Sequence, residues 1–231
     1  MPFDNLGLDP AILQALTSSG YTEPTPVQTD TIPLVLAGHD LMVSAQTGSG
    51  KTAAFMLPAL QKLAVPSLVE GRGPRILVLT PTRELALQIT TAAERYGRNL
   101  PRIKMGTILG GMPYPLQNKM LSARLDILVA TPGRLLDHIG RGRLDFSRLE
   151  ILVIDEADRM LDMGFIDDVA EIGRALPATR QTLLFSATFE GAITKLAQTI
   201  LKDPKRIAIS GAQDKHENIE QRLLYTDDMG H

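Results

Sequence analysis

The sequence predicts an α/β protein, a three-layer α/β/α sandwich built on a parallel sheet, and three observations lead to that prediction. Short apolar runs alternate along the chain with longer stretches of helical composition. The runs are apolar at nearly every position, which is typical of strands buried on both faces of a parallel sheet. Polar groups directly follow two of the runs, and ligands bind at the carboxyl ends of strands in such sheets.

The N-terminal part of the chain, residues 1–39, is expected to be largely helical. Asp9 with Pro10, and Thr25 with Pro26, have the form of an N-cap followed by a first-turn proline. A short polar side chain at the N-cap accepts a free backbone N–H, and proline at the first helical position loses no hydrogen bond. Two helices are therefore expected before the first strand.

The rest of the chain alternates between the two kinds of segment. Strands are expected at residues 40–43, 76–79, 105–109, 127–130, 151–154, 183–185 and 207–209. Helices are expected at residues 84–96, 114–121, 134–139, 167–176 and 192–201. A longer segment over residues 65–74 contains two glycines and two prolines and is expected to be an exposed loop.

With 231 residues, the chain can bury one good-sized core. We expect one domain over residues 1–210, which includes the helical region at residues 1–39. Residues 211–218 have the polar composition of a linker, and residues 219–225 resemble the first strand of a further domain. Residues 211–231 are therefore interpreted as a linker and the start of an absent second domain, and the chain as one domain of a larger protein.

The composition excludes several classes of protein. There are no cysteines, so neither a disulfide framework nor a thiolate site is available, which suits the reducing cytoplasm where we expect this protein. No signal peptide or 18-residue apolar stretch is found. The net charge is -2, so any contact with nucleic acid must come from local donors. The histidines lack metal-ligand spacing and are expected to be surface or structural residues: His39, His138, His216 and His231.

A glycine-rich loop lies between the first expected strand and a helical stretch. It consists of Ala45, Gln46, Thr47, Gly48, Ser49, Gly50, Lys51 and Thr52. Glycines let several backbone N–H groups point at one spot, and the helix N-terminus adds partial positive charge, so the loop can bind a polyphosphate. Lys51 can then reach the β and γ phosphates, and the Thr52 hydroxyl can ligate Mg²⁺. Ala45 stands where the general pattern has glycine, and the alternative is a flexible turn before a helix.

Two carboxylates follow the apolar run at residues 151–154 directly. Asp155 is placed to hold Mg²⁺ through its water shell, because a hard ion that keeps waters suits one carboxylate plus phosphate oxygens. Glu156 would point the other way from the strand end and could accept the proton of a water that attacks the γ-phosphate. The alternative is an acidic surface turn that caps a helix.

An aromatic residue and an amide lie close to the glycine-rich loop in the sequence. Tyr21 and Gln28 flank two rigid prolines, Pro24 and Pro26. An aromatic face and an amide that both donates and accepts could recognise the edge of a purine. The alternative is that Tyr21 packs in the interior and Gln28 is solvated.

Three further segments directly follow apolar runs, so we expect them along one edge of the sheet. They are Pro81, Thr82, Arg83 and Glu84; Gly110 and Gly111; and Thr131, Pro132, Gly133 and Arg134. The arginines supply charge, while threonine and glycine supply neutral donors to phosphate. Such contacts do not read base edges, so binding to nucleic acid should be largely indifferent to base sequence. The last segment alone is also an ordinary turn and helix start.

These motifs resemble those of the DEAD-box RNA helicases, of bacterial type. Asp155, Glu156, Ala157 and Asp158 spell the name of the family. The isolated Phe3 and residues 20–28 are similar to the family's Q motif, 45–52 to motif I, 81–86 to motif Ia, 110–111 to the GG doublet, 131–134 to motif Ib and 186–188 to motif III. Motif I of the family itself has alanine at the first position. The resemblance covers roughly residues 3–210.

The resemblance implies a RecA-like domain that uses ATP and Mg²⁺ and grips the backbone of single-stranded RNA at the three segments above. Tyr21 would stack on adenine and Gln28 would bond its edge. Ser186 and Thr188, with Asp158, would link the nucleotide state to the RNA side. In the family a second domain brings arginines to the γ-phosphate. We therefore expect this chain alone to be monomeric and nearly inactive, and the full-length protein to couple ATP hydrolysis to local duplex unwinding.

Three other functions remain open at this stage. A GTPase would need an Asn-Lys-x-Asp guanine reader, and the one candidate, at residues 118–121, ends in leucine. A nucleotide-gated docking module for RNA or protein, without turnover, is an alternative of a different class. A related DNA helicase or translocase is the third, and the resemblance of residues 20–28 and 155–158 favours the RNA branch.

Overall fold

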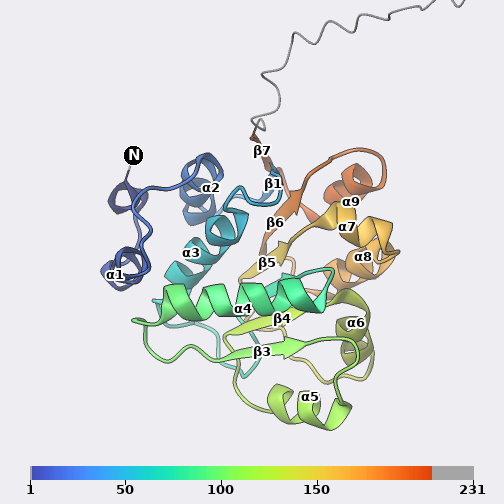
Figure 1. The fold of residues 1–231 in the computed structure, drawn as a ribbon. Helices are drawn as coiled ribbons and strands as arrows, with labels where there is room; N and C mark the ends of the chain where they lie inside the picture. Colours follow the sequence, from blue (N-terminus) through green and yellow to red (C-terminus); the bar gives the residue numbers. More distant parts are fainter. Residues whose placement is uncertain (1, 210–231) are drawn as a thin grey trace, which may run out of the picture.

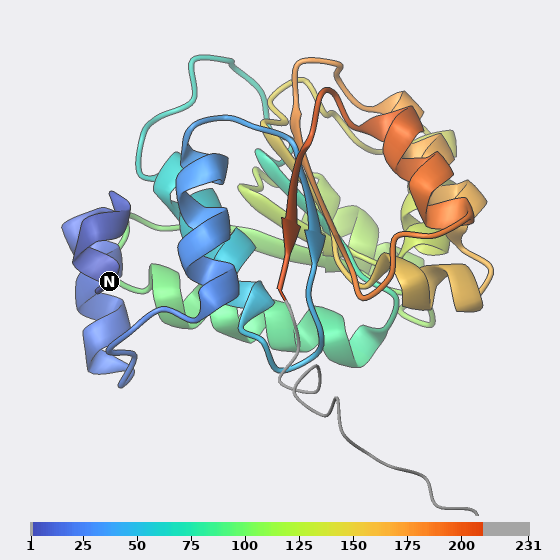
Figure 2. The same ribbon diagram turned by 90° about the horizontal axis from the view of Figure 1, so that it is seen from above.

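Parallel strands form the central layer of the molecule, and helices cover both faces of the sheet (Figures 1 and 2). In the computed structural model, which describes residues 2–209, the sheet has seven strands in the order β3-β4-β2-β5-β6-β1-β7. Every pairing is parallel. In chain order the strands are β1 (Leu41–Ser44), β2 (Ile76–Leu79), β3 (Met105–Ile108), β4 (Ile127–Ala130), β5 (Ile151–Ile154), β6 (Gln181–Ser186) and β7 (Lys205–Ala208). The predicted parallel α/β/α sandwich is confirmed.

The helices divide between the two faces of the sheet. A short 3-10 helix, η1 (Phe3–Leu6), precedes α1 (Pro10–Ser18), α2 (Pro26–Leu36), α3 (Lys51–Leu63) and α4 (Arg83–Gly97). After these come α5 (Tyr114–Leu121), α6 (Pro132–Gly140), α7 (Ala157–Asp162), α8 (Ile166–Ala175) and α9 (Ala192–Ile200). Apolar residues of α1 to α4 form one core with the sheet, and those of α6 to α9 form the other. Figure 2 shows these two groups on opposite sides of the strands.

The alternation of side chains along each strand explains why the strands are apolar throughout. Successive side chains point to opposite faces of a sheet. In β2, Ile76 and Val78 belong to the core under α1 to α4, while Leu77 and Leu79 belong to the core under α6 to α9. All four are fully buried. A strand covered on both faces therefore has no position that favours a polar side chain.

The starts of β1 and β6 differ from the prediction because polar side chains there are hydrogen-bonded inside the protein. β6 begins at Gln181, two residues before the apolar run. The amide of Gln181 donates to the carbonyl oxygens of Val35 and His39, at 3.0 and 2.7 Å. β1 begins after Asp40, whose carboxylate accepts the backbone N–H of Thr182 at 2.9 Å. A hydrophobic pattern alone does not detect polar residues that are paired across elements.

Several other expectations can be compared with the structure. The helical N-terminal region is confirmed, and Asp9 caps α1 by accepting the backbone N–H of Ala11 at 2.8 Å. The loop at residues 65–74 is confirmed, with Val65 and Leu68 exposed. Helix α7 was not predicted.

The expected linker and start of a second domain at residues 211–231 lie outside the described residues. No helix within residues 2–209 combines the length and the apolar character that a bilayer crossing needs.

The strand order decides which loops meet at the carboxyl edge of the sheet. The glycine-rich loop at residues 45–52, called the phosphate loop from here on, follows β1. Ser186 ends β6 and Asp155 follows β5, and these three strands are adjacent. The segments that begin at Pro81, Gly110 and Thr131 follow or lie just beyond β2, β3 and β4, which form the other half of the edge. The phosphate loop and the acidic pair are not on directly paired strands, because β6 lies between β1 and β5.

Candidate functional site

The phosphate loop connects β1 to the first turn of α3. Gly48 and Gly50 have φ angles of +83° and +88°, in the left-handed region that glycine adopts without strain. Gly50 is the N-cap of α3, so the chain passes directly from the left-handed loop into the helix. Ala45 is buried, and its N–H donates to the carbonyl oxygen of Ser186 at 3.3 Å. The residue in the unusual first position therefore extends the pairing of β1 with β6.

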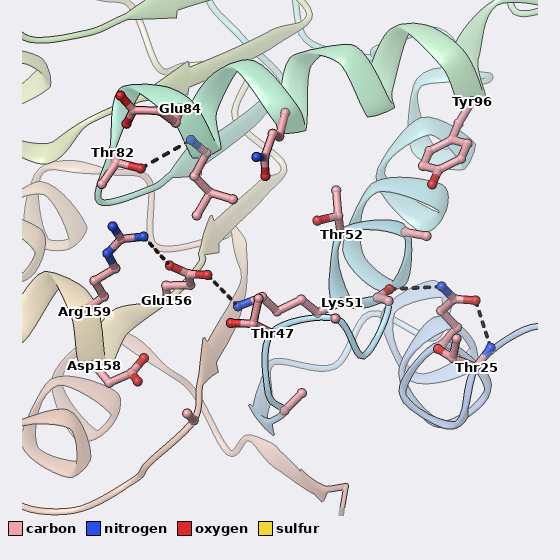
Figure 3. Close-up of a pocket in the computed structure, with 18 of the residues that line it drawn as sticks. Thr25, Thr47, Lys51, Thr52, Thr82, Glu84, Tyr96, Glu156, Asp158 and Arg159 are labelled. Atoms are coloured by element: carbon pink, nitrogen blue, oxygen red, sulfur yellow. Dashed lines mark hydrogen bonds and ion pairs between the residues drawn. The ribbon is translucent and has the colours of Figure 1, made fainter. Parts of the chain in front are cut away.

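Lys51 faces both carboxylates of the acidic pair, and Figure 3 shows its contact with Glu156. Its Nζ lies 3.3 Å from Oδ1 of Asp155 and 3.3 Å from Oε1 of Glu156. The lysine side chain is only 10% exposed, so the ion pairs lie in a partly dry environment where charges interact more strongly than in water. Thr52, one residue further into α3, lines the same cleft. Segments more than a hundred residues apart thus form one polar centre.

The backbone at Glu156 explains how both carboxylates reach one lysine. Glu156 has φ 55° and ψ 53°, a left-handed conformation that is rare for a residue with a side chain. The strand has ended at Ile154, and Glu156 is the N-cap of α7. The expectation that Glu156 points away from Asp155 is wrong, because this reversal turns its carboxylate back towards Lys51. Strained residues of this kind cluster at functional sites.

Asp155 is completely buried, and apart from the ion pair of its Oδ1 with Lys51, its carboxylate oxygens have no hydrogen-bond partner among the described residues. Burial raises the pKa of this carboxyl to about 6, although the Lys51 ammonium opposes that shift. A buried carboxylate that faces only one ammonium group suits a hard divalent cation, which takes oxygen ligands. No cluster of three or more acidic or histidine side chains able to hold a metal is found in residues 2–209. An ion at Thr52 and Asp155 would therefore take phosphate oxygens and water as its other ligands.

A cleft of about 990 Å³ opens over these groups and joins most of the residues expected to bind nucleotide. Its lining includes Tyr21, Gln28, Thr47, Gly48, Gly50, Lys51, Thr52, Thr82, Glu84, Glu156 and Asp158. Two other residues of the loop, Gln46 and Ser49, are exposed and half-buried respectively. Thr82 and Glu84, which were expected on the RNA side, lie across this cleft from Lys51 and Thr52 (Figure 3).

Gln28 is almost fully buried, so the alternative of a solvated side chain is wrong. Its Oε1 accepts the backbone N–H of Thr25 at 3.0 Å, and its Nε2 donates to the carbonyl oxygen of Gly50 at 3.0 Å. Gln28 thus caps α2 and holds Gly50, the residue of the phosphate loop that caps α3. Both ends of the amide are used inside the protein, and its role as a purine reader stays a prediction.

Tyr21 is half-buried at one end of the cleft. Its ring meets that of Tyr96 edge to face, with the ring centroids 5.6 Å apart. Burial, together with the neighbouring Tyr21 hydroxyl, raises the pKa of Tyr96, so this phenol stays protonated. Tyr21 therefore packs partly in the interior, as the alternative interpretation expected, and it also lines the cleft. Stacking of Tyr21 on adenine stays a prediction.

The segment after β2 begins with a buried proline and a capped helix. Pro81 is buried, and Thr82 is the N-cap of α4, where its hydroxyl accepts the N–H of Leu85 at 3.3 Å. Arg83 is exposed in the first turn, so its guanidinium can reach a ligand. Within this segment, Arg83 supplies the exposed positive charge at the carboxyl edge of the sheet.

The other two segments are in direct contact. Gly110 and Gly111 are exposed, and the N–H of Gly110 donates to Oγ1 of Thr131 at 3.3 Å. Pro132 is buried at the start of α6, and Gly133 is half-buried. Arg134 was expected to supply charge to phosphate, but its Nη1 donates to the carbonyl oxygen of Met112 at 2.7 Å. This guanidinium is turned into the protein.

Three residues were expected to link the nucleotide state to the RNA side. They lie at or after the ends of β5 and β6, between the phosphate loop and the segments expected to bind RNA. Asp158 lines the cleft, Ser186 is buried at the end of β6, and Thr188 is exposed. The N–H of Thr188 donates to Oγ of Ser186 at 3.4 Å. Hydrogen bonds within residues 2–209 do not join Asp158 to either residue, so the coupling role stays a prediction.

Sequence reasoning missed two residues of the site. Tyr96 contacts Tyr21 from the far end of α4, and no local pattern marks it. Arg159 brings Nη1 to 3.5 Å from Oε2 of Glu156 (Figure 3). Its position three residues after Glu156 at a helix start is a signal that could have identified it.

Gly50→Ala is expected to disrupt the loop more than Gly48→Ala. A Cβ on Gly50 would lie 2.6 Å from Nε2 of Gln28 and 2.8 Å from Oγ1 of Thr25, while no atom lies within 4 Å at Gly48. Both substitutions incur the left-handed strain of about 1–2 kcal/mol. Thermal unfolding and nucleotide titration of the two variants measure the difference. Equal effects would show that the contact with Gln28 does not constrain the loop.

Comparison with known proteins places the chain among helicases. A family model described as "DEAD/DEAH box helicase" matches residues 25–196. A protein of Klebsiella pneumoniae named "ATP-dependent RNA helicase DeaD" is 46% identical over 219 residues, which cover 95% of this chain and 33% of that protein. A protein of the same name from Mycobacterium tuberculosis is 45% identical over 222 residues, covering 96% of this chain and 39% of that protein. The chain thus spans about a third of the length of the curated relatives that it matches.

Two solved structures are similar to this fold. The crystal structure of a DEAD box protein from the hyperthermophile Methanococcus jannaschii superposes with a TM-score of 0.83 at 40% identity, covering 90% of this chain and 56% of that one. A hypothetical ATP-dependent RNA helicase from Sulfolobus tokodaii gives a TM-score of 0.79 at 41% identity, covering 87% of this chain and 57% of that one.

Proposed function

This chain belongs to the DEAD/DEAH box helicase family, and on that premise we propose that it is the ATP-binding domain of an ATP-dependent RNA helicase. The observation that supports this most directly is the position of Lys51 between Asp155 and Glu156, with Thr52 on the same cleft. Relatives named as ATP-dependent RNA helicases match nearly the whole chain. The proposed substrates are ATP and the backbone of single-stranded RNA.

The nucleotide half of the site supplies three functions. The N–H groups of the phosphate loop and the Lys51 ammonium would bind the β and γ phosphates. Mg²⁺, held by Thr52 and Asp155, would neutralise charge on the phosphate oxygens. Glu156 would accept the proton of the attacking water, because its carboxylate is close to Lys51 and therefore close to the γ-phosphate position. Positioning and charge stabilisation account for most catalysis of phosphoryl transfer.

The other half of the edge is proposed to bind RNA. Gly110 and Gly111 are exposed; the N–H of Gly110 is bonded to Thr131, so Gly111 supplies the backbone donor, and Arg83 adds an exposed cation. Donors of this kind contact phosphate and sugar, so they position a strand without reading its bases. The strands β3, β4 and β2, which carry these segments, are adjacent, so the donors lie along one continuous track.

An arginine that reaches the transferred phosphate can increase the rate about 10³- to 10⁵-fold. In the full-length protein we propose that a second domain, joined through the residues after the sheet, supplies such arginines and couples hydrolysis to local unwinding. This chain alone would then bind adenine nucleotide weakly and turn it over poorly.

The experiment measures nucleotide affinity and hydrolysis for the 231-residue chain and for the full-length protein, each with and without single-stranded RNA. We expect weak ATP binding and little hydrolysis by the chain, and RNA-stimulated hydrolysis by the full-length protein. Competition by GTP and by single-stranded DNA tests the choice of substrates. Robust RNA-stimulated hydrolysis by the chain alone would refute the division between two domains, and absence of nucleotide binding by both proteins would refute the proposal.

A further inference from the structure

A buried polar cluster lies behind the turn formed by Gly110 and Gly111, between α5 and α6. Its central residue is Gln117, whose side chain is 1% exposed. His138, on α6, is fully buried, and Arg134, one turn earlier on the same helix, is half-buried. None of these side chains lines the nucleotide cleft. Polar groups are buried at a cost unless they are hydrogen-bonded, so the arrangement calls for a physical explanation.

The hydrogen bonds of Gln117 determine the orientation of its neighbours. Its Nε2 donates to the carbonyl oxygen of Leu109 at 2.9 Å, so its Oε1 must act as the acceptor. That oxygen accepts from Nη1 of Arg134 at 3.2 Å and lies 2.8 Å from Nε2 of His138. Because an amide oxygen cannot donate, His138 must carry its proton on Nε2. The Leu109 carbonyl and the Arg134 guanidinium therefore fix the direction of the Gln117 amide, and His138 adds a second donor to its oxygen.

The cluster holds the main chain on both sides of the glycine pair. Gln117 holds the carbonyl oxygen of Leu109, which directly precedes Gly110. Arg134 holds the carbonyl oxygen of Met112, which directly follows Gly111, at 2.7 Å. The turn itself is closed by one long bond, from the N–H of Met112 to the same Leu109 oxygen at 3.4 Å. Its geometry thus depends on the cluster more than on its own hydrogen bond.

The guanidinium of Arg134 is fixed by a further contact. It lies over the ring of Tyr114, 4.2 Å from the centroid, in a cation–π arrangement. The Tyr114 hydroxyl in turn donates to Oδ2 of Asp137 at 2.7 Å. A planar guanidinium that bridges two acceptors and stacks on a ring cannot be replaced by lysine, which is a point charge on a flexible stem. Arg134 therefore shapes the turn and is not a free phosphate ligand.

We propose that Gln117 and His138 are positioning residues for RNA: they hold the Gly110–Gly111 turn so that the backbone N–H of Gly111 is preorganised for a phosphodiester of the strand. The inference rests on the proposed function, because it assumes that this turn contacts RNA. Neither residue touches the strand. A turn that is already fixed in its binding geometry avoids an ordering cost when the ligand binds.

The test compares Gln117→Leu with Gln181→Leu in the full-length protein. Gln181 is a matched control, because it is also buried, its amide also donates to backbone carbonyls, and it lies at the start of β6, away from the carboxyl edge of the sheet. Anisotropy of a labelled single-stranded oligouridylate at low salt measures RNA affinity, and a nucleotide titration runs in parallel. Both variants should lose stability. Only Gln117→Leu should weaken RNA binding, about tenfold, with nucleotide affinity unchanged.

A second pair of variants covers the case in which Gln117→Leu does not fold. The side chain of glutamine can place an N–H close to the position of Nε2 of His138, so His138→Gln should retain RNA affinity while His138→Leu loses it. Arg134→Lys should behave like a loss of Arg134, although the charge is retained. If these side chains only stabilised the fold, their substitution would lower RNA affinity and nucleotide affinity together.

The outcomes distinguish this inference from the proposed function. If Arg83→Ala weakens RNA binding while Gln117→Leu and His138→Leu bind RNA as well as Gln181→Leu does, the positioning role is refuted and the proposed function stands. If the unaltered protein binds no RNA, or binds it without any effect of Arg83→Ala or these variants, RNA does not use this edge and both are refuted.

Discussion

Replacing Glu156 by Gln is expected to reduce ATP turnover by the full-length protein about 10²- to 10⁴-fold, while nucleotide binding is largely retained. Glutamine has nearly the shape of glutamate, but its amide cannot accept a proton from the attacking water. Lys51 keeps its ion pair with Asp155, 3.3 Å away, so the site should stay assembled. Steady-state hydrolysis and a nucleotide titration measure the two effects separately.

Glu171→Gln is a suitable control for the loss of a negative charge, because Glu171 is exposed on α8. It should leave turnover unchanged. The same pair of variants separates an enzyme from a nucleotide-gated docking module, since a docking module would keep its function when Glu156 is replaced. Turnover that survives Glu156→Gln would exclude Glu156 as the general base.

Replacing Asp155 by Asn is expected to stabilise the fold at neutral pH while it weakens binding of Mg²⁺ with nucleotide. Burial raises the pKa of Asp155 to about 6, compared with 3.8 for an ordinary aspartate. Each pKa unit corresponds to about 1.4 kcal/mol, so the buried charge costs about 2–3 kcal/mol of unfolding free energy once the carboxyl is ionised in the folded state. Asparagine carries no charge to bury.

The pH dependence gives this prediction a definite sign. The folded state holds the proton of Asp155 more tightly than the unfolded state does, so this residue stabilises the fold fully below pH 3.8. That stability is lost as the pH rises from about 3.8 to about 6. The gain from Asp155→Asn should therefore be small near pH 4 and reach its full value above pH 6. Chemical denaturation of both proteins at several pH values measures it, and a gain independent of pH would contradict the raised pKa.

The fold was predictable from sequence because burial on both faces leaves a local signal. The strands at residues 76–79, 127–130 and 151–154 are apolar throughout, and their bounds agree with the structure. The starts of β1 and β6 were misplaced because Asp40 and Gln181 are satisfied by distant backbone groups. Strand order leaves no local signal either, so the position of β6 between β1 and β5 could not be predicted.

The site was predictable as a set of residues but only partly as a geometry. The spacing of Lys51 and Asp155 from their strands was enough to predict that polar groups meet at one edge. The direction of the Glu156 side chain was not predictable, because it depends on a left-handed backbone conformation that strand periodicity does not indicate. The inward bonds of Gln28 and Arg134 also escaped prediction, since both depend on partners that the fold brings together.

A crystal structure of the chain with Mg²⁺ and a non-hydrolysable ATP analogue would test the nucleotide site most directly. We expect the triphosphate in the cleft, with the Lys51 ammonium moved from Asp155 and Glu156 to the β and γ phosphates, and the ion beside Thr52 and Asp155. A nucleotide bound elsewhere, or one bound while Lys51 still pairs with both carboxylates, would contradict the assignment of these four residues to one site.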